Sequence, residues 1–305
     1  MKKYIKIGLK GMAMGAADVV PGVSGGTIAF ITGIYEELIK SISYIGPELI
    51  LNFKKQGLKN TWIKANGNFL LSLFIGIAIS IFSLMRITNH LLETYPILVW
   101  SFFFGLVLAS VFYVGKQIKT WKAKHIIFLI MGFSVAFGIS LLNPSSESTS
   151  LVYLFFAGSL AICAMILPGI SGAFILVLLG AYKNISEAVS NFDFKVILSV
   201  GLGAIFGLLT FSRILKWLFK HYQSVTLATL TGFIAGSLIK IWPWKLTTKT
   251  LLVKDKVIDV SQTPVLPTNY EGDALLLPSI GLMLIGIGTI FLLEFYGSKP
   301  VKNKI

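Results

Sequence analysis

The chain of 305 residues is 55% hydrophobic and only 13% charged, and its mean hydropathy is +0.80. Soluble domains carry roughly twice this fraction of charge, so the composition excludes a soluble globular protein and predicts an all-α polytopic membrane protein. The net charge of +14 does not indicate nucleic-acid binding, because the lysines lie between apolar stretches, where they meet lipid headgroups. With Cys163 as its single cysteine, the chain can form no intrachain disulfide.

The first apolar stretch, 11–40, is interrupted by residues that disfavour a helix. Pro21 removes a backbone donor, and Gly22, Gly25 and Gly26 permit turns. About 13 residues on each side of the break would make ~20 Å of helix, which is too short for a membrane core of ~30 Å. We therefore expect 11–40 to form a re-entrant helical hairpin.

The rest of the chain is expected to add three spans to this hairpin and then to repeat the arrangement. The expected spans are 69–87, 97–115, 126–142, 196–212, 225–242 and 274–295. A second re-entrant hairpin is expected at 151–187, broken at 168–172. The longest polar insert, 243–273, contains an alternating stretch at 250–260 that predicts a small β-hairpin.

The distribution of lysines predicts how these segments are oriented. The basic loops are 40–68, 116–124 and 213–223, and the C-terminal residues are also basic. The loops without a marked excess of positive charge are 143–150, 183–195 and 243–273. If each hairpin enters and leaves on one side, all basic segments fall together, and the positive-inside rule places them in the cytoplasm with both termini. A single span over 11–39 would instead place the loop at 40–68 outside.

The two halves of the chain repeat each other. Nine residues of the first hairpin match the residues 147 positions later: Gly11, Ala17, Pro21, Gly22, Ser24, Gly25, Ile28, Gly33 and Tyr35. Eight residues of the following spans match the residues 127 positions later: Ser72, Gly76, Arg86, Ile87, Leu91, Tyr95, Gly105 and Ser110. We therefore expect two units, 1–150 and 151–305. Because three spans are an odd number, the second unit enters the membrane upside down, an arrangement typical of transporters.

The hairpin tips carry polar groups where apolar ones would be expected. The candidate binding residues there are Pro21, Gly22, Ser24, Gly25, Gly26 and Thr27 in the first tip and Pro168, Gly169, Ser171 and Gly172 in the second. Backbone N–H groups at the start of a helix, together with hydroxyl donors, suit an anion and above all a phosphate. The alternative is that the glycines allow tight helix packing, but packing does not explain the serines.

Two arginines, Arg86 and Arg213, occupy the same position in the two repeats. A guanidinium group can bind two phosphate oxygens at once. The alternative is that each arginine extends to the membrane interface, as is common at the ends of spans. That alternative explains one arginine better than two related by the repeat, so we predict that both take part in substrate recognition.

The first tip also contains Asp18, whose counterpart in the second tip is Met165. A carboxylate at membrane depth should be paired or protonated, so Asp18 either carries a proton during transport or braces the tip. Glu36 is a second candidate for proton coupling, although a solvated pair with Glu37 at headgroup level is the favoured interpretation.

Nothing in the sequence indicates a metal centre or a known catalytic set. His90, His125 and His221 lack metal-ligand spacing, and no nucleophile–base set or phosphate-binding loop is found. We expect no cofactor, no metal and no enzymatic activity. The residues alone leave two other classes open. One is a channel or carrier for a small soluble anion such as phosphate, and the other is a membrane lipid phosphatase or transferase.

Two motifs of the chain resemble those of the bacterial polyprenyl-phosphate transporter family, which was long catalogued only as a domain of unknown function. They are Gly-x-x-Met-Gly-x-Ala-Asp-x-Val-Pro-Gly-Val-Ser-Gly-Gly-Thr at 11–27 and Leu-Pro-Gly-Ile-Ser-Gly at 167–172. The resemblance covers essentially the whole chain. Ala173 and Phe174 stand opposite Gly26 and Thr27, which makes the second tip less polar than the first.

This resemblance implies a multi-pass translocase of the bacterial plasma membrane that returns undecaprenyl phosphate from the outer to the inner leaflet for cell-envelope synthesis. The lipid phosphate is then expected to bind the two tips and the two arginines, while the repeats rock to expose the site to each leaflet in turn. The expected partners are undecaprenyl phosphate, membrane lipids and protons as a coupling ion, and the sequence is compatible with an oligomer.

Overall fold

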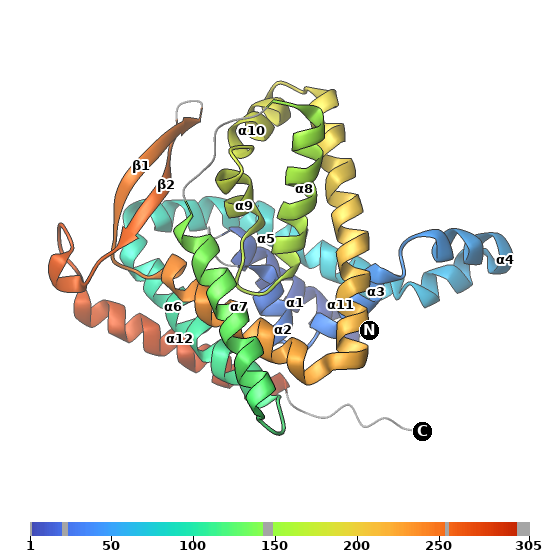
Figure 1. Cartoon of the computed structure of the whole chain (residues 1–305), viewed down its shortest axis with the longest axis horizontal. Helices are drawn as coiled ribbons and strands as arrows, with labels where there is room; N and C mark the ends of the chain where they lie inside the picture. The colour runs from blue at the N-terminus through green and yellow to red at the C-terminus, as the bar shows by residue number, and fades with distance from the viewer. Residues whose placement is uncertain (1, 20–23, 143–148, 254–255, 298–305) are drawn as a thin grey trace.

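The computed structural model describes residues 2–19, 24–142, 149–253 and 256–297. Within these residues the chain is mostly α-helical, with one pair of antiparallel strands at its edge (Figure 1). Pro21 and Gly22 of the first tip lie outside the described residues, as does the side chain of Arg86.

Both expected hairpins are built from three helices in the same order. They are α1 (Lys2–Val19), α2 (Gly25–Ile31) and α3 (Tyr35–Ser43) in the first, and α8 (Leu151–Ile166), α9 (Gly172–Leu178) and α10 (Tyr182–Ser190) in the second. The helices α2 and α9 begin and end 147 positions apart, and so do α3 and α10. The repeat seen in the sequence is therefore also a repeat of secondary structure in this part of the chain.

The arm that follows each tip is broken, although the sequence predicted a continuous one. The chain turns at Gly33 with φ of 70° and at Gly180 with φ of 62°. These left-handed values favour glycine, since a Cβ would strain the backbone there. As a result α9 and α10 are bent by 112° relative to each other.

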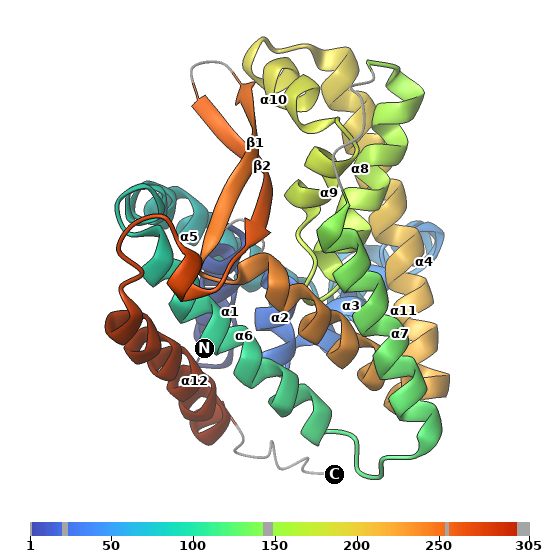
Figure 2. The same ribbon diagram turned by 60° about the vertical axis from the view of Figure 1, so that its left-hand side comes forward.

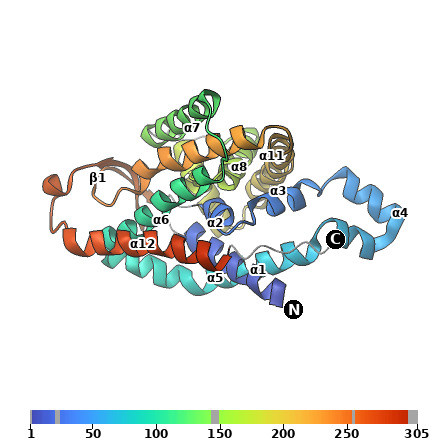
Figure 3. The same ribbon diagram turned by 90° about the horizontal axis from the view of Figure 1, so that it is seen from below.

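The remaining elements connect the hairpins and complete the membrane region. They are α4 (Pro47–Lys64), α5 (Gly67–Thr94), α6 (Pro96–Lys116), α7 (Ala123–Leu141), α11 (Phe194–Ser237), η1 (Leu238–Ile241), η2 (Pro267–Asn269) and α12 (Leu276–Gly297). Figure 3 shows α4 extending away from the other helices. The strands β1 (Lys245–Val253) and β2 (Lys256–Pro264) confirm the predicted β-hairpin, which is longer than 250–260.

The expected loop at 213–223 is shorter in the structure, because the first helical part continues past Arg213 and the break comes at Tyr222, within that range. One residue, Tyr222, has non-helical torsion angles of φ −136° and ψ 41° inside this helix of 44 residues. No glycine or proline stands between Gly207 and Gly232, so nothing local ends the helix where the charges are. The two expected spans 196–212 and 225–242 are thus the two parts of one interrupted helix.

Several of these helices have the length and composition of membrane spans. In the described part of the chain, α5, α6, α7 and α11 with η1 each qualify, and the bent pair α9–α10 would be a fifth. Large apolar side chains point outward from them, such as Phe82, which is 86% exposed, and Phe112, which is 71% exposed. Apolar surface of this extent fits contact with lipid tails, so the chain is a multi-pass membrane protein.

Glycines at matching positions allow the helices to approach closely. A Cβ on Gly158 of α8 would lie 2.6 Å from the Val200 carbonyl oxygen of α11, and a Cβ on Gly11 of α1 would meet the Leu73 carbonyl oxygen of α5. These two contacts are related by the shifts of 147 and 127 positions. Small residues at helix interfaces are typical of membrane proteins.

Helices of the two halves also pack against each other. Gly105 of α6 packs against the Met283 carbonyl of α12, and its repeat mate Gly232, in the second part of α11, packs against the Leu129 carbonyl of α7. Figure 2 shows α12 running beside α6 and α7 running beside α11. The last helix of each half is thus held by the preceding helix of the other half, which joins the two halves into one body.

Candidate functional site

The tips of the two hairpins meet and are joined by side-chain hydrogen bonds. The Ser24 hydroxyl donates to the Met165 carbonyl oxygen at 3.0 Å and also lies 3.4 Å from that of Leu167. The Thr27 hydroxyl accepts a hydrogen bond of 3.0 Å from the Gly169 N–H. Ser24 and Thr27 are each only 1% exposed. The two polar side chains predicted to bind a phosphate therefore hold the second tip in this structure.

Glycines at the junction of the tips have no room for a side chain. A Cβ on Gly26 would lie 2.6 Å from the Ile166 carbonyl oxygen, and one on Gly172 would lie 2.6 Å from that of Ala161. Gly169 has a φ of 89°, and a Cβ there would lie 2.9 Å from Ile234 Cα. The close packing that the sequence left as an alternative is thus what these three glycines provide here.

Asp18 braces the first tip. Its Oδ1 accepts a hydrogen bond of 2.6 Å from the Gly25 N–H, and the Ser24 hydroxyl accepts one of 3.1 Å from the Gly26 N–H. Two of the free N–H groups at the start of α2 are therefore satisfied by side chains of the same hairpin. In the second tip the Ser171 hydroxyl accepts a longer bond, of 3.5 Å, from the Phe174 N–H, one residue further along the helix than in the first tip.

Arg213 lies away from this junction. It is exposed on α11, and its Nη2 donates a hydrogen bond of 3.2 Å to the Ile45 carbonyl oxygen, just after α3. Arg86 lies on α5, and its side chain falls outside the described residues. The structure thus brings together the polar residues of the two tips and sets Arg213 beside the end of the first hairpin.

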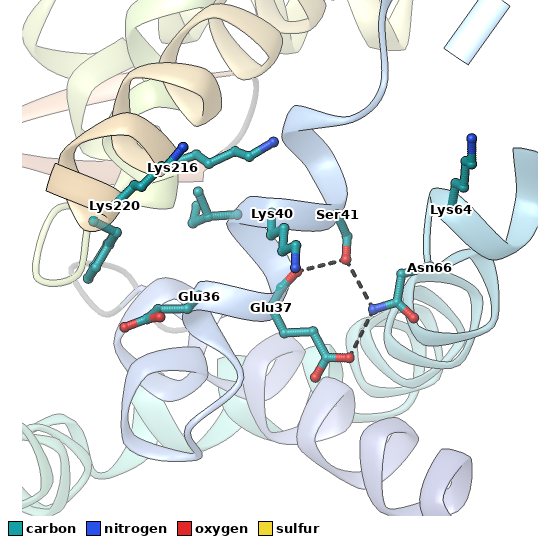
Figure 4. Close-up of a pocket in the computed structure, with 10 residues that line it drawn as sticks. Glu36, Glu37, Lys40, Ser41, Lys64, Asn66, Lys216 and Lys220 are labelled. Atoms are coloured by element: carbon teal, nitrogen blue, oxygen red, sulfur yellow. Dashed lines mark hydrogen bonds between the residues drawn. The ribbon is translucent and has the colours of Figure 1, made fainter. Parts of the chain in front are cut away.

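A cavity of about 700 Å³ opens between α3, the α4–α5 junction and α11 (Figure 4). Its charged and amide side chains are Glu36, Glu37, Lys40, Lys64, Asn66, Lys216 and Lys220. Figure 4 shows Lys216 and Lys220 on α11 facing α3, with Lys64 and Asn66 on the other side of α3. We call this space the basic cavity, because four lysines outnumber two glutamates in its lining.

Neutral amides hold the two glutamates of the basic cavity. Gln223 donates to Glu36 Oε1 at 3.0 Å, and Asn66 donates to Glu37 Oε1 at 2.9 Å. Within the described residues, Lys40, Lys216 and Lys220 form no ion pair with these or other carboxylates. Their ammonium groups therefore remain available to an anion that enters the cavity.

The positions of these lysines in the sequence predict the orientation of the protein but not a shared cavity. One local signal pointed to part of it, because Arg213, Lys216 and Lys220 are spaced to lie on one face of a helix. The partners on α3 are about 180 positions away, and no local pattern reveals them. In the described part of the chain no group of three or more potential ligands could hold a metal ion.

Together the fold and this site define a multi-pass membrane protein with two broken hairpins joined at their tips and a basic cavity between helices. The chain belongs to the undecaprenyl phosphate translocase-like family, whose sequence profile matches residues 14–257. This confirms the family that its two motifs resemble.

Two relatives extend this similarity over most of the chain. The polyprenyl-phosphate transporter of Vibrio cholerae is 45% identical over 305 residues, which cover 97% of this chain and 98% of that protein. The polyprenyl-phosphate transporter of Staphylococcus aureus is 36% identical over 259 residues, which cover 79% of this chain and 87% of that protein. No solved structure matches.

Proposed function

We propose that this protein is a translocase that moves undecaprenyl phosphate across the bacterial plasma membrane, from the outer to the inner leaflet, without chemical change. The observation that carries the proposal is the basic cavity of about 700 Å³, which is lined by three lysines that form no ion pair with a carboxylate of the described residues. A lipid phosphate suits such a protein, because its headgroup is an anion while its tail can stay among apolar helices and lipid.

The proposed orientation places both termini and the basic cavity on the cytoplasmic side. Lys40, Lys64, Lys216 and Lys220 all belong to segments that the positive-inside rule assigns to that side. In Figure 1 the β1–β2 hairpin and α10 lie at the top and the α6–α7 connection lies at the bottom, which fits the assignment of these loops to opposite sides. The two halves would then be inverted repeats, 1–150 and 151–305, each with a hairpin and three spans.

In the proposed cycle the headgroup passes between the two tips, and the repeats rock around them. The candidate residues are those of the tips, namely Pro21, Gly22, Ser24, Gly25, Gly26 and Thr27 with Pro168, Gly169, Ser171 and Gly172, together with Arg86 and Arg213. Because Ser24 and Thr27 bind the second tip in this structure, a phosphate there must replace those hydrogen bonds with its own oxygens. Binding of the headgroup and separation of the tips are then one event.

Proton coupling is assigned to Asp18, with Glu36 as the second candidate. The Asp18 carboxylate accepts a hydrogen bond from the Gly25 N–H at 2.6 Å. Protonation would weaken this bond, because a neutral carboxyl is a poorer acceptor than a carboxylate. A proton on Asp18 would therefore loosen the first tip at the point where it meets the second.

The test is a leaflet-accessibility assay in proteoliposomes that carry undecaprenyl phosphate, run with and without a pH gradient. We expect translocation by the wild-type protein and at least about a tenfold slower rate in the double variant Lys216→Gln, Lys220→Gln, since each contact with a charged group is worth about 1.5–3 kcal/mol. The double variant Lys54→Gln, Lys59→Gln, which removes the same charge from the exposed helix α4, should keep the wild-type rate.

Each rival class predicts a different result in the same vesicles. Flux of soluble phosphate without translocation of the lipid would identify a carrier or channel for a small anion. Release of inorganic phosphate from the lipid would identify a phosphatase. Either result would overturn the proposal.

A further inference from the structure

We propose that Lys240 and Ser171 form a second phosphate-binding site, at the second tip, and that the apolar groove beside it holds the polyprenyl tail. This inference rests on the proposed function. It adds a second binding site for the lipid, on the side of the membrane opposite the basic cavity. In this structure the second site is closed.

Lys240 is a half-buried cation at the end of an apolar span. It lies on η1, between Ile239 and Ile241, and its ammonium group sits 3.9 Å from the centre of the Phe174 ring of α9. Among the described residues no carboxylate pairs with it. The half-buried ammonium group lies over an aromatic ring and keeps the capacity to donate hydrogen bonds to an anion, so Lys240 is a candidate partner for a phosphate.

The second tip faces this lysine. Gly169 and Ser171 of the tip, Ser140 of α7 and Lys240 line one small cavity of about 10 Å³. Ser171 is half-buried, and the bond it accepts from the Phe174 N–H is long at 3.5 Å. Its repeat mate Ser24 is instead committed to the first tip and to the Met165 carbonyl. Ser171 is therefore the tip hydroxyl with capacity left for a ligand.

An apolar groove of about 320 Å³ is bordered by two of the elements that line this cavity. Phe104 of α6, Phe133 and Phe137 of α7, and Trp242 are among its walls. The same two elements, α7 and η1, border both spaces, since Ser140 and Lys240 lie in the cavity while Phe137 and Ile239 lie in the groove. A ligand with an anionic head and an apolar tail matches this pair of spaces, and a polyprenyl monophosphate has that form.

The basic cavity and the second site lie at opposite ends of one helical segment. Gln223 holds Glu36 at the basic cavity, and Lys240 follows 17 residues later in α11 and η1. At about 1.5 Å per residue this separation is about 25 Å, close to the ~30 Å of a membrane core. The cavity at Lys240, of about 10 Å³, admits no more than a water molecule, whereas the basic cavity is about 700 Å³. Of these two sites, only the basic cavity is therefore open in this conformation.

The test measures protection of a cysteine placed in the cavity. In a Cys163→Ser background, Ser140→Cys supplies one thiol, and its rate of modification by a membrane-impermeant thiol reagent is followed in proteoliposomes. We expect farnesyl monophosphate, a short polyprenyl phosphate, to slow modification about tenfold when Lys240 is present and not to slow it in Lys240→Gln, because one charge-assisted contact is worth about 1.5–3 kcal/mol. Lys240→Arg should restore protection, and Lys195→Gln, an exposed lysine of α11, should leave it unchanged.

The other arms decide what the site recognises. Farnesol should not protect, because it lacks the phosphate, and inorganic phosphate should protect far less than the lipid, because it lacks the tail. Equal protection by farnesol, equal protection by inorganic phosphate, or undiminished protection in Lys240→Gln would each overturn the inference. Protection by the lipid phosphate in a protein that does not translocate it would instead support the site and contradict the proposed function.

Discussion

The two hairpins share their order of helices and differ in their surroundings. Every residue of α2 is buried, whereas only Gly172 and Ile175 are buried in α9. Gly26 is pressed against the Ile166 carbonyl, while its repeat mate Ala173 is exposed. Thr27 holds the second tip, while its mate Phe174 covers Lys240. The two repeats thus share the same order of helices, but the first tip is enclosed by neighbouring groups and the second is partly exposed. The second hairpin is the one with space to move.

Placing the same large residue at positions 26 and 173 should show the largest difference between the hairpins. Gly26→Leu is expected to lower the free energy of unfolding by about 3 kcal/mol, because its Cβ alone would lie 2.6 Å from the Ile166 carbonyl oxygen. Ala173→Leu, on an exposed position, should change it by less than about 0.5 kcal/mol. Thermal unfolding in detergent measures both, and equal effects would contradict the difference in confinement.

Removing the hydroxyl of Thr27 should have the next largest effect. Thr27→Val keeps the shape of the side chain but leaves the buried Gly169 N–H without its acceptor, at a cost of about 2 kcal/mol. The matched control is Thr289→Val, whose hydroxyl bonds only its own helix at the Ile285 carbonyl, on an exposed face. Thermal unfolding of both variants checks this prediction, and a Thr27 variant as stable as the control would show that the bond does not join the tips.

Changing the charge of Asp18 should have a smaller effect on stability and a distinct effect on transport. Asp18→Asn is expected to cost about 1 kcal/mol, because a neutral acceptor replaces a carboxylate in the bond to the Gly25 N–H. If Asp18 carries the coupled proton, the variant should also lose the acceleration of translocation by a pH gradient. Retained acceleration in a folded variant would leave Asp18 with the bracing role alone.

The smallest effect on stability is expected at the second tip. Ser171→Ala removes a hydroxyl that caps α9 through a bond of 3.5 Å, so the loss should be about 0.5 kcal/mol. Thermal unfolding should therefore separate this variant from Thr27→Val. A loss as large as that of Thr27→Val would mean that the second tip is as tightly held as the first.

Local sequence signals were sufficient for the breaks at the tips, the repeat and the β-hairpin, but not for the turns at Gly33 and Gly180. Pro168 and the tip glycines end helices through their own backbone preferences, and the alternation at 250–260 reports a strand directly. The predicted end of the span at Ser212 is wrong, because charge alone does not end a helix. Lysine and arginine are good helix formers, and the helix continues through Arg213, Lys216 and Lys220 until Tyr222.

The functional contacts could not be predicted in the same way, because they join distant positions. Ser24 and Met165 are 141 residues apart, and Glu36 and Gln223 are 187 residues apart. Periodicity describes one helix at a time and does not say which face meets which neighbour. The sequence therefore suggests that the serines at the tips bind an anion, but it does not reveal that the two tips bind each other.

The single interruption at Tyr222 forms a joint between the two parts of α11. Its first part carries α8 and the second hairpin, and its second part is clasped by α7. A change in the backbone torsion angles of this one residue would move the two parts against each other, and the close contact of Gly169 with Ile234 would have to change with it. Because the basic cavity lies beside the joint and Lys240 lies at the far end of the second part, a small rotation at Tyr222 would become a large displacement at the second tip.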